Sequence, residues 1–170
     1  AIYTSSLSNK LAMEQCAMLG ITPYEIPIID INKSVKYVIS ENFLPINNNI
    51  AAENIQSRIR GLLLMTLSNE TGKVVLSTGN KSELAVGYST LYGDMSGSFS
   101  PLKDLYKTDI YKLSIYRNSF KKAIPEKILK REPSAELNFN QKDTDSLPSY
   151  DKLDKILKSL SLIHISEPTR

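Results

Sequence analysis

Apolar residues recur at helical spacing in several parts of the chain. The most regular pattern runs through residues 51–67, and it predicts a helix that covers the core with one side. The residues on that side are Ile55, Ile59, Leu62, Leu63 and Thr66. Weaker patterns of the same period predict further helices. These lie at residues 8–19, with Ser8 as cap and Gly20 as C′ residue, and at 31–41, 104–122, 125–129 and 150–160.

Other apolar runs are too short for a helix and predict strands. Residues 73–77 are apolar and mostly β-branched, which is typical of a strand buried on both faces. Residues 22–28 predict a second strand, and residues 1–6 the end of another. Because strands and helices alternate, the chain is expected to form a parallel α/β sheet.

Composition narrows the class of protein only a little. The chain has 170 residues, an ordinary size for one domain, and its net charge of +3 does not argue for a nucleic-acid partner. Cys16 is the single cysteine, which excludes an internal disulfide and fits a reducing, cytoplasmic location. It lies on a helical apolar pattern, so we expect a buried structural thiol. No apolar run reaches membrane-spanning length.

The candidate chemistry follows the predicted strand at 73–77. A turn at 78–80 leads into a predicted helix at 81–88, so the turn would lie at the carboxyl edge of the sheet, where α/β folds bind ligands. Thr78 brings a hydroxyl, Glu83 a carboxylate, and Asp94 and Lys107 further charges. A carboxylate beside bound phosphates suits Mg²⁺. Spacing alone leaves an alternative open, in which Glu83 complements a helix dipole and Lys107 is a solvated helix residue.

Four sequence blocks follow one another in the chain. The central one is TGNKSELAVGYSTLYGDMSGSFSPLKDLYKT, preceded by ENIQSRIRG and followed by REPSAEL and QKDTDSLPSYDKLDKIL. In this order they resemble the NAD⁺ synthetase family and above all its glutamine-dependent members. The resemblance covers residues 1–160, nearly the whole chain. Four blocks in a fixed order are far more specific than any one of them.

The resemblance implies a fold and a reaction. The fold would be α/β, a Rossmann-like three-layer parallel sheet with helices on both faces, as in the ATP pyrophosphatase (adenine nucleotide α-hydrolase-like) superfamily. Nothing in the chain matches the Ser-Gly-Gly-x-Asp-Ser loop of that superfamily, so we expect an N-terminally truncated domain. In the implied reaction Mg²⁺–ATP adenylates the nicotinate carboxylate of deamido-NAD⁺. Ammonia then displaces AMP to give NAD⁺.

The same resemblance assigns site residues. Thr78, Lys107 and Ser134 match residues that bind ATP, and Glu83 matches the Mg²⁺ ligand. Arg58 matches the arginine that contacts deamido-NAD⁺, and a guanidinium fork suits a carboxylate or pyrophosphate. No side-chain nucleophile is needed, which agrees with the lack of any Ser/His/Asp or Cys/His set.

Two positions depart from the family pattern. Ser98 stands where glutamine-dependent members usually have glycine, and Leu91 where some ammonia-dependent members have a substrate-binding lysine. Leu91 therefore favours the glutamine-dependent type, with ammonia supplied by glutamine or taken up free. That type implies a glutaminase domain in the full-length protein, and the family implies a homodimer.

The last ten residues, SLIHISEPTR, do not fit the pattern and resemble translated sequencing-adapter sequence. We expect a partial synthetase domain at 1–160 and a non-native tail at 161–170, so His164 receives no role. Two other hypotheses for the function stay open. One is another adenylating ATP pyrophosphatase, acting on tRNA or a nucleotide, although the basic or cysteine-bearing segments expected of a tRNA enzyme are missing. The other is a non-catalytic nucleotide-binding remnant.

Overall fold

Helix α3, Asn49–Thr71, is the longest element of the computed structural model, which describes residues 2–166 and their side chains as far as residue 161. It begins where the Asn48 side chain accepts the N–H groups of Ile50 and Ala51, and Gly72 ends it with φ 65°. The helix predicted at 51–67 is therefore confirmed, with one more turn at its C-terminal end.

The predicted inner side of this helix is correct only in part. Ile59 is buried, whereas Leu62 is 62% exposed and Thr66 is exposed as well, so the assignment of these two to the core was wrong. Ser57 and Gly61 are buried instead. They face the loop at 90–97, which the periodicity of apolar residues cannot reveal.

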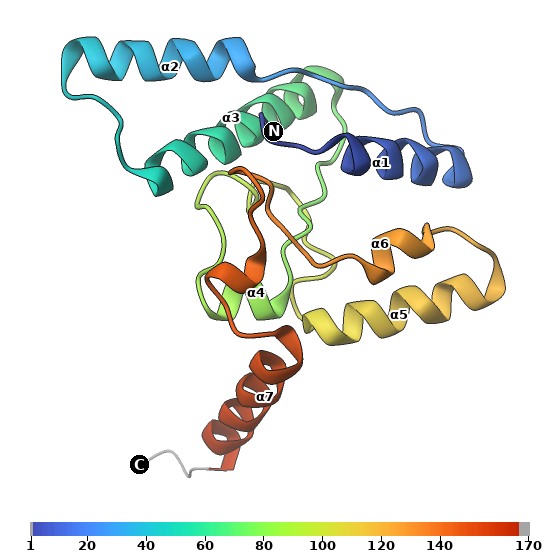
Figure 1. Ribbon diagram of the computed structural model, residues 1–170. Coiled ribbons are helices and arrows are strands. Elements are labelled where there is room, and N and C mark those ends of the chain that lie inside the picture. The colour runs from blue at the N-terminus through green and yellow to red at the C-terminus, as the bar shows by residue number, and fades with distance from the viewer. Residues whose placement is uncertain (1, 167–170) are drawn as a thin grey trace.

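Helices α1, Ser6–Leu19, and α2, Ile29–Asn42, lie at the same end of the molecule as α3 (Figure 1). Ser5, and not the predicted Ser8, caps α1, because its hydroxyl accepts the N–H of Ser8 at 3.1 Å. Gly20 ends the helix in the left-handed conformation, as predicted. Helix α2 packs on α3 and confirms the helix expected at 31–41.

Cys16 on α1 is only half-buried, so the prediction of a buried thiol was wrong.

The other helices form a second group (Figure 1). They are α4, Lys81–Ala85; α5, Lys107–Phe120; α6, Glu126–Lys130; a 3-10 turn, Asp143–Asp145; and α7, Tyr150–Ser166. Helices α4, α5 and α7 pack against one another, and α6 packs on α5. All of the predicted helices in this half are present. However, α5 begins three residues later than expected, and two of its predicted core residues, Leu113 and Ile115, are exposed.

The predicted sheet is not confirmed. Within residues 2–166 the structure holds no strand, and the one ladder contact is an isolated parallel bridge between Leu76 and Phe99. The predicted burial of residues 73–77 was wrong for Val74 and Leu76, which are 65% and 58% exposed, whereas Val75 is half-buried and Ser77 buried. Residues 22–28 likewise form no strand. A strand inside a sheet is hydrogen-bonded to a neighbouring strand on each side. Within the described residues, 73–77 has such a neighbour on one side only, at residues 97–99.

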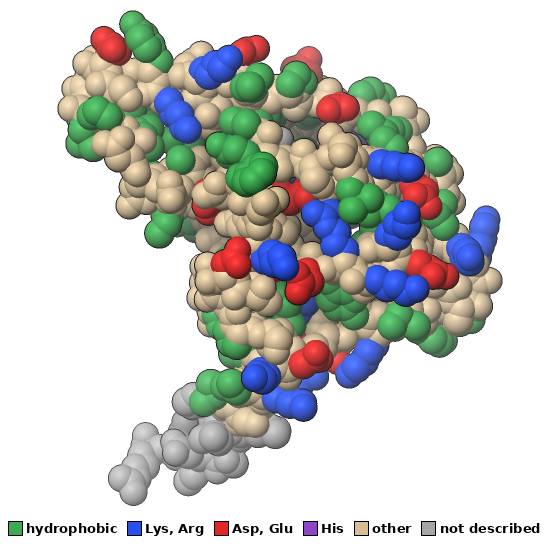
Figure 2. Space-filling view, in the orientation of Figure 1, with side chains coloured by type: hydrophobic (Ala, Val, Ile, Leu, Met, Phe, Trp, Pro, Cys, Tyr) green, Lys and Arg blue, Asp and Glu red, His purple; other side chains and the backbone are tan. Residues whose placement is uncertain are grey.

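Much apolar surface is therefore left exposed. On the face drawn in Figure 2 apolar side chains are scattered over the end that holds α1–α3, and Lys and Arg side chains gather toward the α5–α6 end. No helix in the described part of the chain is long and apolar enough to span a membrane.

Candidate active site

Two of the predicted site residues meet where α4 and α5 begin. The Asn80 side chain accepts the N–H of Glu83 at 3.1 Å, and Glu83 Oε2 accepts the N–H of Asn80 at 3.3 Å. This reciprocal cap fixes Glu83 in the first turn of α4. Lys107, the first residue of α5, places Nζ 2.8 Å from Glu83 Oε1, with the two side chains only 20% and 17% exposed. The predicted metal carboxylate and ATP lysine thus form a half-buried ion pair.

Lys107 also lies against an aromatic ring that is itself anchored. Its Nζ is 5.3 Å from the centroid of Tyr150, a cation–π distance. The Tyr150 hydroxyl donates to Asp143 at 2.8 Å, and the Tyr88 hydroxyl donates to the other oxygen of Asp143 at 3.2 Å. Burial raises the pKa of Tyr88 and Tyr150, and the Asp143 carboxylate raises both further. Both hydroxyls therefore stay protonated donors at neutral pH.

Thr78, the predicted ATP residue of the 78–80 turn, lies exposed just before α4. Its hydroxyl makes no hydrogen bond within the described residues, so it is available to a ligand.

Ser134 lies in a different place, on the wall of a hollow of about 750 Å³. The hollow is bounded by residues 2–5, 131–132, 134, 136 and 138–142. The Ser134 hydroxyl donates to the carbonyl of Gln141 and accepts the N–H of Glu136 at 3.1 Å. The structure brings Ser134 to the hollow but does not place Thr78, Glu83 or Lys107 in its lining.

A cluster of charge and hydroxyls closes one side of the hollow, and sequence reasoning missed it. Glu136 Oε1 accepts from Arg131 at 2.5 Å, from Ser8 at 2.7 Å and from Ser5 at 3.0 Å. Burial raises the pKa of Glu136, but the bonds from Arg131 and the two serines outweigh it, so the pKa is lowered overall. Glu136 is therefore ionised at neutral pH and joins α1 to the loop at 131–142. Glu136 also has φ 50°, a local sign of strain that the sequence does not announce.

Arg58 lies on the exposed side of α3, where its Nε donates to the carbonyl of Leu91 at 3.2 Å. The same loop is held to α3 by Ser57, whose hydroxyl accepts the N–H of Asp94 at 3.0 Å. Arg58 is thus tied to the loop at 90–97, and it is not in the lining of the hollow.

Two further α3 residues, unassigned from the sequence, hold the loop that carries Ser134. Buried Gln56 donates to the carbonyl of Leu137 at 2.8 Å. Glu53 accepts from the amides of Asn138 and Gln141, each at 3.2 Å. Both lie in the block ENIQSRIRG, so the resemblance to the family was the one sequence signal that could have indicated them. It assigned a role in that block to Arg58 alone.

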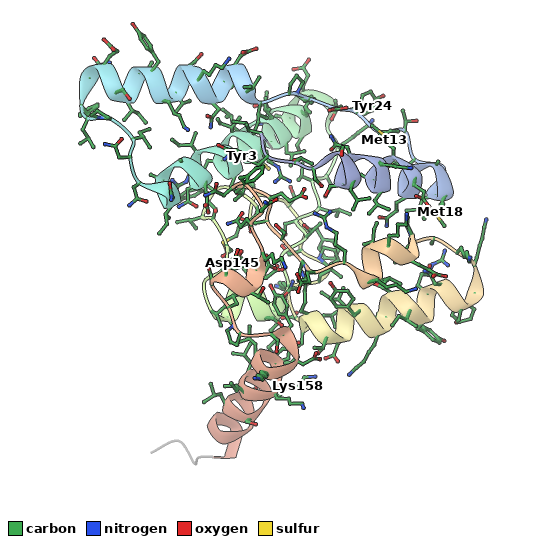
Figure 3. All side chains as sticks on the ribbon, viewed as in Figure 1. Tyr3, Met13, Met18, Tyr24, Asp145 and Lys158 are labelled. Carbon is green, nitrogen blue, oxygen red and sulfur yellow. The ribbon has the colours of Figure 1, made fainter. Side chains whose placement is uncertain are left out.

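The loop continues into the 3-10 turn beside α4, as the position of Asp145 shows (Figure 3). Through Asp143 and Tyr150 it is connected to Lys107. The polar segment at 138–148 therefore connects the hollow that holds Ser134 with the Glu83–Lys107 pair.

No cluster of three or more His, Cys, Asp and Glu side chains that could hold an ion by itself occurs among the described residues. Glu83 is a single carboxylate. Such a donor fits Mg²⁺ shared with the phosphates of a nucleotide, since that ion takes one or two protein carboxylates and completes its shell with phosphate oxygens and water.

The chain is similar to known proteins over nearly its whole length. The family model described as NAD synthase matches residues 1–169. A glutamine-dependent NAD(+) synthetase of Xanthomonas campestris pv. campestris is 51% identical over 157 residues, which are 91% of this chain and 28% of that protein. This chain thus spans less than a third of the length of that relative.

Two solved structures are also similar. The glutamine-dependent NAD⁺ synthetase of Acinetobacter baumannii in complex with ADP has a TM-score of 0.73 at 41% identity, over 98% of this chain and 31% of that one. The NMN synthetase of Francisella tularensis has a TM-score of 0.82 at 26% identity, over 92% and 63%. The chain belongs to the NAD synthase family.

Proposed function

We propose that this chain is the catalytic part of a glutamine-dependent NAD⁺ synthetase, which amidates deamido-NAD⁺ at the expense of ATP. The observation that carries the proposal is the Glu83–Lys107 pair. It lies where two helices begin, in the block that most resembles the family. A carboxylate and an ammonium 2.8 Å apart would separate to meet a metal–triphosphate, each exchanging its partner for one of opposite charge.

Lys107 would neutralise charge that grows on the departing pyrophosphate, and stabilisation of that kind is often the largest single contribution to catalysis. Glu83 would hold Mg²⁺, which when bound withdraws charge from the phosphates. Tyr150 would keep the ammonium of Lys107 oriented in the meantime, because its ring lies beneath Nζ and its hydroxyl is anchored on Asp143.

The other assigned residues would position the two substrates. Thr78, with its hydroxyl available, and Ser134, on the wall of the hollow, would contact ATP. Arg58, which is bonded to the loop at 90–97, would bind deamido-NAD⁺. Holding the two substrates in register supplies much of the rate of such a reaction, because no covalent enzyme intermediate is required.

Residues 73–77 and 97–99 would belong to a parallel sheet in the complete protein. The parallel bridge between Leu76 and Phe99 and the exposed apolar side chains beside it support this assignment. A glutaminase domain, cytoplasmic location and homodimer belong to the same proposal. The name and length of the relatives support the first of these.

A second candidate substrate is nicotinate mononucleotide. The likeness to an NMN synthetase favours it, with a TM-score of 0.82, although the sequence identity of 26% is well below that of the dinucleotide enzymes. Both candidates share the adenylation chemistry and differ in the size of the acid that must be bound.

The test uses the full-length protein that contains this chain, with ATP, Mg²⁺ and ammonia, and compares deamido-NAD⁺ with nicotinate mononucleotide. We expect NAD⁺ formation to dominate. Arg58→Ala should raise the KM for deamido-NAD⁺ more than that for ATP, and Lys107→Ala should mainly impair use of ATP. Preference for the mononucleotide would select the second candidate. An identical defect in the two variants would contradict the assigned division of roles.

A further inference from the structure

Asp154 on α7 is a buried carboxylate without a cationic partner among the described residues. It is 2% exposed, yet none of the ion pairs of the structure includes it. Buried aspartates are rare unless they are paired. Asp154 is instead satisfied by neutral donors: Oδ1 accepts from the hydroxyl of Ser82 at 2.5 Å, and Oδ2 accepts the N–H of Thr108 at 2.9 Å.

The hydrogen bonds of Ser82 and Asp154 reach the backbone at the start of α5. Tyr106, the residue before the helix, supplies no side-chain cap. The N–H of Lys107 is bonded to Ser82 Oγ at 2.8 Å, and the N–H of Thr108 to Asp154. The first two donors of α5 are thus satisfied from α4 and α7, two helices far away in the sequence. The carboxylate also lies at the positive end of the helix dipole, which favours its charge.

The arrangement holds Lys107 at both ends. Ser82 binds its backbone N–H, and the adjacent Glu83 binds its Nζ. The Ser82 hydroxyl points at the backbone of Lys107 with its lone pair because its proton is given to Asp154. Ser82 itself is 0% exposed, so no water can replace that acceptor without opening the packing of α4, α5 and α7.

We propose that Asp154 is a positioning residue for Lys107: from α7 it fixes Ser82 and the first turn of α5, so that the Lys107 ammonium meets Glu83 and the phosphates of the nucleotide. The part of this inference that concerns ATP rests on the function proposed above. The part that concerns the placement of Lys107 does not. Asp154 acts through Lys107 and touches no substrate.

The kinetic test is a double-mutant cycle in the full-length protein with ammonia as nitrogen donor. Asp154→Asn keeps the shape of the side chain but removes one acceptor. It should lower kcat/KM for ATP about tenfold, the scale of losing a helix cap, and leave the KM for deamido-NAD⁺ within about twofold. In a Lys107→Ala background the same substitution should cost nothing further. An equal loss in both backgrounds would show a merely structural role and overturn the proposal.

Asp109→Asn is the matched control. Asp109 also lies in the first turn of α5, but it is half-exposed and caps no N–H within the described residues. It binds α7 through Lys158 at 2.9 Å, and Figure 3 shows Lys158 on that helix. We expect it to leave kcat/KM for ATP unchanged.

A second measurement does not depend on the reaction. Amine-reactive labelling, read by mass spectrometry, should modify Lys107 several-fold faster in Asp154→Asn, and also in the milder Ser82→Ala, than in the wild type or Asp109→Asn. Unchanged labelling in both variants would refute the positioning role even if the protein makes NAD⁺. If the wild-type protein makes no NAD⁺ but Lys107 is labelled faster in the two variants, the proposed function is refuted and the placement of Lys107 is upheld.

Discussion

Glu83 has both carboxylate oxygens occupied, one by Lys107 and one by the N–H of Asn80. Under the proposed function a bound metal would compete with Lys107 for Oε1, and the triphosphate would offer Lys107 a better partner. We predict that in the complete enzyme Glu83→Gln lowers turnover roughly 10²- to 10³-fold, the usual scale for removing one charged transition-state contact. The variant should also need more Mg²⁺, because a neutral amide binds the ion poorly.

Turnover measured across a Mg²⁺ titration checks this. Glu126→Gln is the control, since Glu126 forms only an exposed i,i+4 pair with Lys130, of a kind that contributes little. If Glu83→Gln turns over as fast as the wild type at low Mg²⁺, the assignment of Glu83 as a metal ligand is wrong.

For single residues, the sequence could indicate Glu83 and Lys107 as candidate site residues, because both lie in one contiguous motif. It could not indicate Asp143 or Asp154. Their partners Tyr88 and Ser82 lie 55 and 72 residues away, and only tertiary packing brings them together, in the case of Ser82 and Asp154 the packing of α4 with α7. Buried polar residues of this kind carry no periodic signal, because what satisfies them is tertiary.

Among the elements, α3 depends on small residues where it meets the loop at 90–97. A Cβ at Gly61 would lie 2.6 Å from the carbonyl oxygen of Tyr92 and 2.7 Å from Ser96 Oγ. Alanine in a helix interior normally stabilises by roughly 0.5–1 kcal/mol, but here the clash should prevail. We predict that Gly61→Ala lowers the free energy of unfolding by about 1–3 kcal/mol, as overpacking commonly does.

Urea unfolding of the complete protein measures the effect. Asn69→Ala, at an exposed position of the same helix, should be neutral or slightly stabilising, because alanine is the better helix former. If both substitutions behave alike, α3 does not approach the loop as closely as the structure places it.

Helix positions were predictable because their signals are local, whereas the starts of α1 and α5 were misplaced by a few residues. Gly20 ends α1 as expected, and each expected helix is present. Which side of a helix is buried was less predictable. On α5, Leu113 and Ile115 were both expected inside but lie exposed. They are two positions apart, so they point to different sides of the helix and cannot share one buried face. Periodicity predicts an apolar face, whereas the partner that buries it lies elsewhere.

The whole molecule shows why the sheet could not be confirmed. Its candidate strand, residues 73–77, has the composition of a buried strand but makes one isolated bridge, with Val74, Leu76 and Phe99 all more than half exposed. This chain corresponds to 28% of one relative and 31% of another. We infer that its apolar surfaces are matched to parts of the protein outside residues 1–170.

The last prediction follows from that mismatch. Expressed alone, residues 1–160 should bind a hydrophobic dye, self-associate and form no NAD⁺ from ATP, Mg²⁺, deamido-NAD⁺ and saturating ammonia. Exposed apolar patches favour association. We expect no product because the Ser-Gly-Gly-x-Asp-Ser phosphate loop implied by the resemblance is absent from residues 1–160. Holding two substrates in register is worth roughly 7–11 kcal/mol of such a barrier.

The control is the same segment within the complete protein, which should bind little dye and make NAD⁺ with ammonia. Dye fluorescence, sedimentation velocity and NAD⁺ formation give three separate readings. A monomeric, dye-free segment would show that the exposed surfaces need no partner. NAD⁺ formation by the segment alone would show that Thr78, Glu83, Lys107 and Ser134 already make a complete ATP site.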